Sequence, residues 1–160
     1  MTDIRVLIAD ADRKLLGRYE FFLEESGLEV AIASTALECV ELLRDFEPDV
    51  LVLEAELPWG QGDGVLDLVQ TEPDVPVRPV IVLSSRPDAE GHHRVGAIEV
   101  AEYHQKPLTS KELRDAIMRV YHESGSIANG SHASGVRNHD PQKTLDHNCV
   151  AGRLRCVDWL

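Results

Sequence analysis

The run 50–53, which reads Val-Leu-Val-Leu, constrains the fold of this chain most, because it is apolar throughout and ends abruptly at Glu54. A strand with one face in water alternates apolar and polar residues, whereas an unbroken apolar strand is buried on both faces. Burial on both faces is typical of a parallel sheet that helices cover on each side. The run therefore predicts an α/β fold with Glu54 at the carboxyl edge of the sheet, where such folds bind ligands.

Apolar runs of strand length alternate with segments of helical period along the chain. The strands are expected at 4–9, 28–33, 49–53, 79–84 and 101–105. Asp12 is placed to cap the first helix, Gly27 to end it, and Thr109 or Ser110 to cap the last helix. The helix expected near 87–97 is weak, because a glycine and two adjacent histidines lower its helix propensity. The alternation predicts a doubly wound, five-stranded parallel sheet with helices on both faces.

Composition excludes several classes of protein. The chain has 160 residues, 43% of them hydrophobic, and no apolar run approaches the ~18–20 residues that cross a membrane. The N-terminus lacks the apolar core of a secretion signal and the three cysteines form no disulfide framework, so a cytoplasmic location is expected. The net charge of −12 repels phosphate backbones, so no direct binding of nucleic acid is expected.

The composition changes after Glu123. Residues 1–123 contain 12 Lys and Arg against 25 Asp and Glu, whereas the stretch that follows, to residue 135, is rich in Gly, Ser and Asn. Such a composition is typical of flexible linkers. We therefore predict one domain over residues 1–123 and a flexible, disordered tail over residues 124–160.

Polar side chains stand at four strand ends of the predicted sheet. Asp10 follows the first strand and Glu54 the third, Ser84 ends the fourth, and Lys106 follows the fifth. Parallel strands bring their carboxyl ends to one edge of the sheet, so these groups are expected to share one site. Carboxylates bind hard cations, and a fixed ammonium stabilises a developing phosphoryl anion.

In this order, and with a Lys-Pro pair at the last position, the motifs resemble the receiver domain of two-component response regulators over about residues 3–122. The resemblance implies a flavodoxin-like sheet with the strand order 2-1-3-4-5. It makes Glu54 the equivalent of the phosphorylated aspartate. It also implies that Ser84 and Lys106 bind phosphoryl oxygens and that Tyr103 is an aromatic switch residue, which turns inward on activation.

Two positions depart from the family pattern. Ala11 stands where a second metal-binding acid is usual, and the next residue, Asp12, belongs to the acidic pocket but is better explained as a helix cap. Glu54 has one methylene more than aspartate, which moves its carboxylate ~1.5 Å, a shift that costs about 10²-fold in a positioned reaction. We expect Glu54 to imitate the phosphorylated state by pairing with Lys106, with a degenerate site or a working phosphoacceptor as alternatives. Magnesium, held by Asp10 and Glu54, is expected to bind weakly at most, and no cofactor is required.

The sequence thus predicts a stand-alone, atypical receiver in phosphorelay signal transduction that acts by protein–protein interaction and is not an enzyme. The expected partner is a histidine kinase, a phosphotransfer protein or an output protein, with no membrane involved. It would be contacted through the fourth helix, fifth strand and fifth helix. The alternative is a haloacid-dehalogenase-like, metal-dependent phosphohydrolase, because Asp10 and Asp12 fit its Asp-x-Asp motif. Against this alternative, Lys14 stands where that family has Thr or Val, and no acidic pair follows Lys106.

Overall fold

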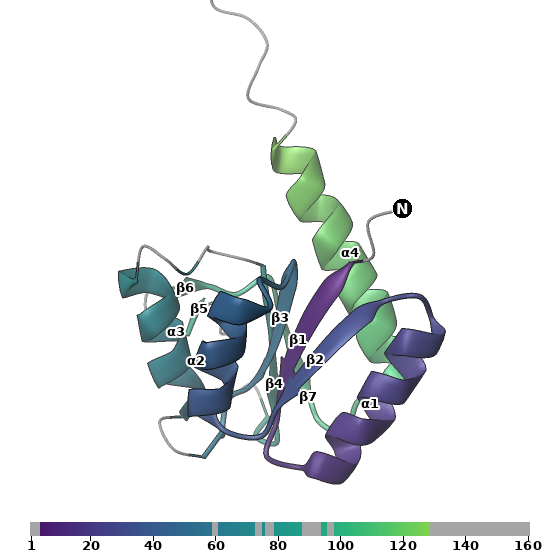
Figure 1. The fold of residues 1–160 in the computed structure, drawn as a ribbon, viewed down its shortest axis with the longest axis horizontal. Coiled ribbons are helices and arrows are strands. Elements are labelled where there is room, and N and C mark those ends of the chain that lie inside the picture. Colours follow the sequence, from purple (N-terminus) through teal and green to yellow (C-terminus); the bar gives the residue numbers. More distant parts are fainter. Residues whose placement is uncertain are drawn as a thin grey trace, which may run out of the picture.

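The computed structural model of the chain describes residues 4–58, 61–72, 75, 79–87, 94–95 and 98–128. Its central strands are β1 Arg5–Ala9, β2 Glu29–Ala33, β3 Val50–Glu54, β4 Val80–Ser84 and β7 Glu102–Gln105. They form one parallel sheet in the order β2-β1-β3-β4-β7, in which β7 is the fifth strand (Figure 1). Each strand lies within one residue of its expected position, so the predicted doubly wound parallel sheet is confirmed.

Helices cover both faces of this sheet. The helices are α1 Arg13–Glu25, α2 Ala36–Asp45, α3 Gln61–Thr71 and α4 Ser110–Ala128. Helices α1 and α4 lie on one face, and α2 and α3 lie on the other (Figure 1). In β1, Val6 and Ile8 pack with α1 and α4, whereas the intervening Leu7 packs with α2 and α3. Strand β3 divides its side chains in the same way, which is why its apolar run is unbroken.

Both ends of α1 and the start of α4 form where the sequence predicts them. The Asp12 carboxylate accepts hydrogen bonds from two backbone N–H groups in the first turn of α1, so Asp12 is the N-cap. Gly27, just past the end of α1, has a φ of 84°, a left-handed conformation that glycine adopts without strain. Thr109 and Glu112 form a capping box at the start of α4, in which each side chain accepts the other residue's backbone N–H. Among the described residues, no helix is long and apolar enough to cross a membrane.

The segment expected as a helix over 87–97 contains strand structure instead. Strands β5 Arg94–Val95 and β6 Ile98–Glu99 form a short antiparallel pair, so the helix prediction is wrong at residues 94–95. Valine and isoleucine are β-branched and favour strands, and the weak helix propensity of the segment does not compete with this preference. The remainder of the expected helix, at 88–93 and 96–97, lies outside the described residues.

Helix α4 continues to Ala128, beyond the domain boundary expected at Glu123. The Ser124 hydroxyl donates to the Val120 carbonyl at 2.7 Å, a bond that a helical serine makes one turn back along the helix. Ser124 and its neighbours are predicted to form a linker from their Gly-, Ser- and Asn-rich composition. In the structure they extend a helix that buried side chains such as Val120 already anchor. The remaining residues of the expected tail, 129–160, lie outside the described part of the chain.

Candidate functional site

The predicted strand ends meet at the carboxyl edge of the sheet. The parallel register places Glu54 beside Leu83, and Ser84 beside Gln105, the residue before Lys106. A backbone hydrogen bond of 2.8 Å from the Lys106 N–H to the Ser84 carbonyl continues the β4–β7 pairing into this edge. The fold therefore positions residues from β3, β4 and β7 around one site.

Lys106 lies at the centre of an ion cluster with two carboxylates. Its Nζ is 2.5 Å from Asp10 Oδ2 and 2.6 Å from Glu54 Oε1. The Glu54 contact is a hydrogen bond, whereas the Asp10 contact is an ion pair without hydrogen-bond alignment. The second Glu54 oxygen, Oε2, accepts a hydrogen bond of 2.8 Å from the Ala11 N–H. The structure contains the expected contact between Glu54 and Lys106, and the imitation of a phosphorylated state stays a prediction.

Burial sets the electrostatics of this ion cluster. Asp10 is fully buried, Glu54 is buried, and the Lys106 side chain is 15% exposed. Burial raises the pKa of Asp10 above its ordinary value, and Lys106 and the Asp12 N–H offset this rise only in part. For Lys106, burial alone would lower the pKa, but Asp10 and Glu54 outweigh burial and the pKa is raised. Two carboxylates around one ammonium leave an excess negative charge, which burial makes unfavourable at Asp10.

The arrangement of the cluster does not fit a magnesium ion. Asp10 Oδ1 accepts the Asp12 N–H at 2.8 Å, and the other oxygens of Asp10 and Glu54 face Lys106 or a backbone N–H. Ala11 adds no side-chain oxygen, and magnesium requires near-ideal octahedral coordination by oxygen. Lys106 thus lies between the two carboxylates that the sequence analysis assigned to the metal. Over the ranges that the structure describes, no group of three or more His, Cys, Asp or Glu side chains is placed to hold a metal ion.

Asp12, the other predicted acid of the pocket, lies outside the ion cluster. Its exposed carboxylate accepts the N–H groups of Leu15 and Lys14 as the cap of α1. The hydrogen bond from Leu15, supported by the one from Lys14, holds the pKa of Asp12 below its ordinary value. Asp12 contacts the cluster through its backbone N–H, which bonds to Asp10.

Ser84 bonds to an acid that the sequence analysis gave no role. Ser84 Oγ donates to Glu56 Oε1 at 2.6 Å, and the Ser85 N–H donates to Glu56 Oε2 at 3.2 Å. Glu56 lies in the turn after β3, two residues beyond Glu54, the last residue of that strand. The sequence shows both acids, but only the pairing of β3 with β4 reveals which of them the Ser84 hydroxyl meets.

Tyr103, the predicted switch residue, is half-buried on β7. Its ring packs against the core on the α2–α3 face, and its hydroxyl donates to the Arg86 carbonyl at 3.5 Å. The Arg86 N–H in turn donates to Ser84 Oγ at 3.0 Å. The loop 84–86 therefore connects Tyr103 with Ser84, two residues to which the resemblance gives related roles.

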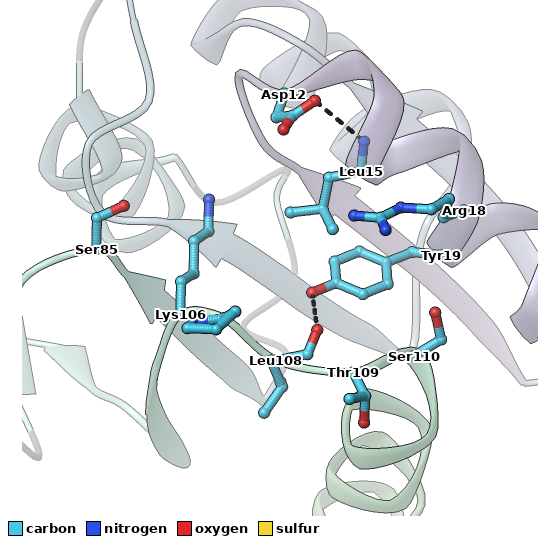
Figure 2. A pocket seen from close by; sticks show the side chains of 10 residues that line it. Asp12, Leu15, Arg18, Tyr19, Ser85, Lys106, Leu108, Thr109 and Ser110 are labelled. Carbon is cyan, nitrogen blue, oxygen red and sulfur yellow. Dashed lines mark hydrogen bonds between the residues drawn. The ribbon is translucent and has the colours of Figure 1, made fainter.

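A pocket of about 660 Å³ opens next to Lys106, between the start of α1 and the loop that joins β7 to α4 (Figure 2). Leu15, Tyr19 and Leu108 line it with apolar surface, and the Tyr19 hydroxyl donates to the Leu108 carbonyl at 2.8 Å. Arg18 and Lys106 contribute two positive charges to the lining. Because Lys106 belongs to both the pocket and the ion cluster, a molecule in the pocket would touch the side chain that holds Glu54.

Sequence comparison identifies the family. Residues 6–118 match the family described as response regulator receiver domain. The transcriptional regulatory protein PrrA of Mycobacterium bovis is 32% identical over 134 residues, which cover 82% of this chain and 55% of PrrA. The probable transcriptional regulator ycf27 of Guillardia theta is 30% identical over 141 residues, which cover 86% of this chain and 54% of that protein. The chain spans about half the length of these relatives.

Solved structures agree on the fold. A CheY-like response regulator receiver domain protein from Methanospirillum hungatei matches with a TM-score of 0.69 and 23% identity, over 79% of this chain and 99% of that one. The chain belongs to the response regulator receiver family of two-component signalling. The family predicted from the strand-end motifs is thus confirmed. These similarities give the phosphohydrolase alternative no support.

Proposed function

We propose that this chain is an atypical receiver that signals by binding a protein partner and does not accept a phosphoryl group on Glu54. The observation that carries the proposal is the hydrogen bond of 2.6 Å between Lys106 Nζ and Glu54 Oε1. The family resemblance assigns this lysine to phosphoryl oxygens. In this chain the Glu54 carboxylate is hydrogen-bonded to the Lys106 ammonium group. It supplies one negative charge, where a phosphoryl group would supply about 1.5 to 2.

Glu54 is a poor nucleophile in this arrangement. Its two oxygens are engaged by Lys106 and by the Ala11 N–H. A nucleophile must reach the phosphorus in a near-attack geometry of about 3–3.5 Å, which Glu54 can reach only after leaving its buried ion pair. Residue 11 offers no acid to assist a metal, so we propose that magnesium binds weakly at most and that no cofactor is required.

The proposed activity is recognition and not catalysis. In a cytoplasmic protein of net charge −12, a kinase, phosphotransfer or output protein is the fitting class of partner, and direct binding of nucleic acid is disfavoured. The proposed docking surface for this protein partner is formed by β7 and α4. Glu102 on β7 bonds to both Arg119 on α4 and His104, with distances between 2.5 and 2.8 Å. The two bonds to Arg119 join β7 to α4, as a docking surface requires, whereas the bond to His104 lies within β7.

Phosphoryl uptake tests the proposal. The 160-residue chain is incubated with acetyl phosphate and magnesium beside a receiver that carries aspartate at the acceptor position, and the intact masses are compared. We expect the control receiver to gain the acid-labile mass of one phosphoryl group and this chain to remain unchanged. A stoichiometric, acid-labile increase that maps to Glu54 would overturn the proposal.

A further inference from the structure

A second carboxylate at the carboxyl edge of the sheet, that of Glu56, accepts hydrogen bonds from Ser84 and Ser85. Glu56 Oε1 accepts from the Ser84 hydroxyl at 2.6 Å, and Oε2 accepts from the Ser85 N–H at 3.2 Å. Arg86 Nε lies 3.9 Å from Oε1. A hydroxyl and a backbone N–H that converge on one carboxylate form a small anion-binding site, because charge-assisted hydrogen bonds of this kind are among the stronger ones in proteins.

The Ser84 hydroxyl is buried, so it depends on an acceptor within the protein. Ser84 is 1% exposed, whereas the Glu56 side chain is 29% exposed and enters the site from the turn after β3. A buried hydroxyl that loses its acceptor is costly, so Ser84 requires a partner on this side. In this chain the partner is Glu56, which leaves Glu54 to Lys106.

We propose that Glu56 is the internal ligand of the donors on Ser84 and Ser85 and thereby positions the loop 84–86. This inference rests on the proposed function in one respect, namely that these donors would otherwise face a phosphoryl group. The negative charge that a phosphoryl group concentrates at one point is then divided between two side chains. Glu54 supplies it at Lys106, and Glu56 supplies it at Ser84.

The loop transmits the position of Glu56 to β7. The Arg86 N–H donates to Ser84 Oγ at 3.0 Å, so the hydroxyl that Glu56 holds also shapes its own loop. The Arg86 carbonyl accepts the Tyr103 hydroxyl at 3.5 Å. Removing Glu56 frees the first two residues of the loop, and the Tyr103 hydroxyl then loses its fixed acceptor.

Hydrogen exchange and NMR of the 160-residue chain test this inference with Glu56→Ala, Ser84→Ala and the double variant. In Glu56→Ala the Ser85 amide should exchange about tenfold faster or more, the effect of losing one charge-assisted hydrogen bond. The Tyr103 ring signals should shift in both single variants, and the double variant should shift no further than the larger single effect. Glu56→Gln, which keeps one acceptor oxygen, should lie between wild type and Glu56→Ala.

Glu72→Ala is the matched control. Glu72 has an ion pair of 3.8 Å with Arg44, close in length to the 3.9 Å between Glu56 and Arg86, so it separates loss of an ion pair from loss of the hydrogen bonds. Glu72→Ala should leave the exchange rate of the Ser85 amide and the ring signals of Tyr103 unchanged. An unchanged Ser85 exchange rate or Tyr103 signal in Glu56→Ala, or simple addition of the two single effects, would overturn the inference. Phosphoryl labelling of Glu54 would overturn the proposed function while leaving these measurements as they are.

Discussion

The Lys106 ammonium and the Asp10 carboxylate form an ion pair of 2.5 Å at a place where Asp10 is fully buried. Removing one partner from such a pair leaves an uncompensated charge in the interior, which is far more costly than the pair itself is favourable. Two carboxylates depend on this one ammonium, because Glu54 bonds to it as well. Lys106 is therefore central to the stability of the domain as well as to its site.

Lys106→Met should lower the free energy of unfolding by about 3–5 kcal/mol, measured by urea denaturation. Adding Asp10→Asn should recover part of this loss, because it removes the unpaired buried charge. The control Lys111→Met changes an exposed lysine at the start of α4 and should alter stability by less than about 0.5 kcal/mol. Equal effects of the two lysine substitutions would contradict the buried ion pair.

Glu102 should make stability depend on pH. Burial raises the pKa of Glu102, but the hydrogen bonds from Arg119 and His104 outweigh burial and hold this pKa below its ordinary value of 4.5. A lowered folded-state pKa stabilises the protein above the unfolded-state value, and this contribution is lost as pH falls through the folded-state value. Glu102→Gln should thus cost up to about 1 kcal/mol at pH 7, a modest figure because Arg119 is half exposed.

Urea denaturation at pH 7 and at a pH well below 4.5 checks this dependence. The difference in the free energy of unfolding between wild type and Glu102→Gln should shrink toward zero at the acid pH. There Glu102 is protonated in both the folded and the unfolded protein, so its charge no longer contributes. A difference that stays constant between the two conditions would show that the ion pair with Arg119 does not carry the effect.

Thr109→Ala should weaken the start of α4. The substitution removes the acceptor of the Glu112 N–H and the hydroxyl that donates to Glu112 Oε2 at 2.6 Å. Loss of such a cap costs about 0.5–2 kcal/mol, which thermal and urea unfolding can resolve. Thr109→Ser should restore most of the loss, and Ser110→Ala, one position along, should have little effect. If Ser110→Ala lowered the stability more than Thr109→Ala, the cap of α4 would be Ser110 instead.

Cys39 should resist alkylation in the native protein. Its side chain is fully buried in the core on the α2–α3 face, and burial raises the pKa of its thiol to about 12. The thiolate is the reactive form, so iodoacetamide at mildly alkaline pH should leave Cys39 unmodified until denaturant is added. Mass mapping of the peptide that contains Cys39, before and after unfolding, gives the answer. Rapid native labelling would mean that α2 opens readily from the sheet.

The strands and the polar groups at their ends could be predicted because each depends on a local signal. An apolar run such as 50–53 and the charged residue that ends it are visible in a few consecutive residues. The antiparallel pair of β5 and β6 could not be predicted, because that segment has weak local preferences. The role of Glu56 was missed for a different reason. It depends on which hydrogen-bond donor at the end of β4 lies beside the turn after β3. A single sequence does not show which side chains of two neighbouring strands lie within hydrogen-bonding distance.

Helix α4 connects the two ends of the domain. It begins at Ser110, four residues after Lys106, and runs past the opposite edge of the sheet to Ala128 (Figure 1). Its 19 residues span about 28 Å at a rise of 1.5 Å per residue. Leu113, Ile117 and Val120 fasten it to the sheet at successive turns. Because these contacts hold α4 along its length, a rearrangement around Lys106 that moved α4 would have to move the helix as one body, including its far end at Ala128.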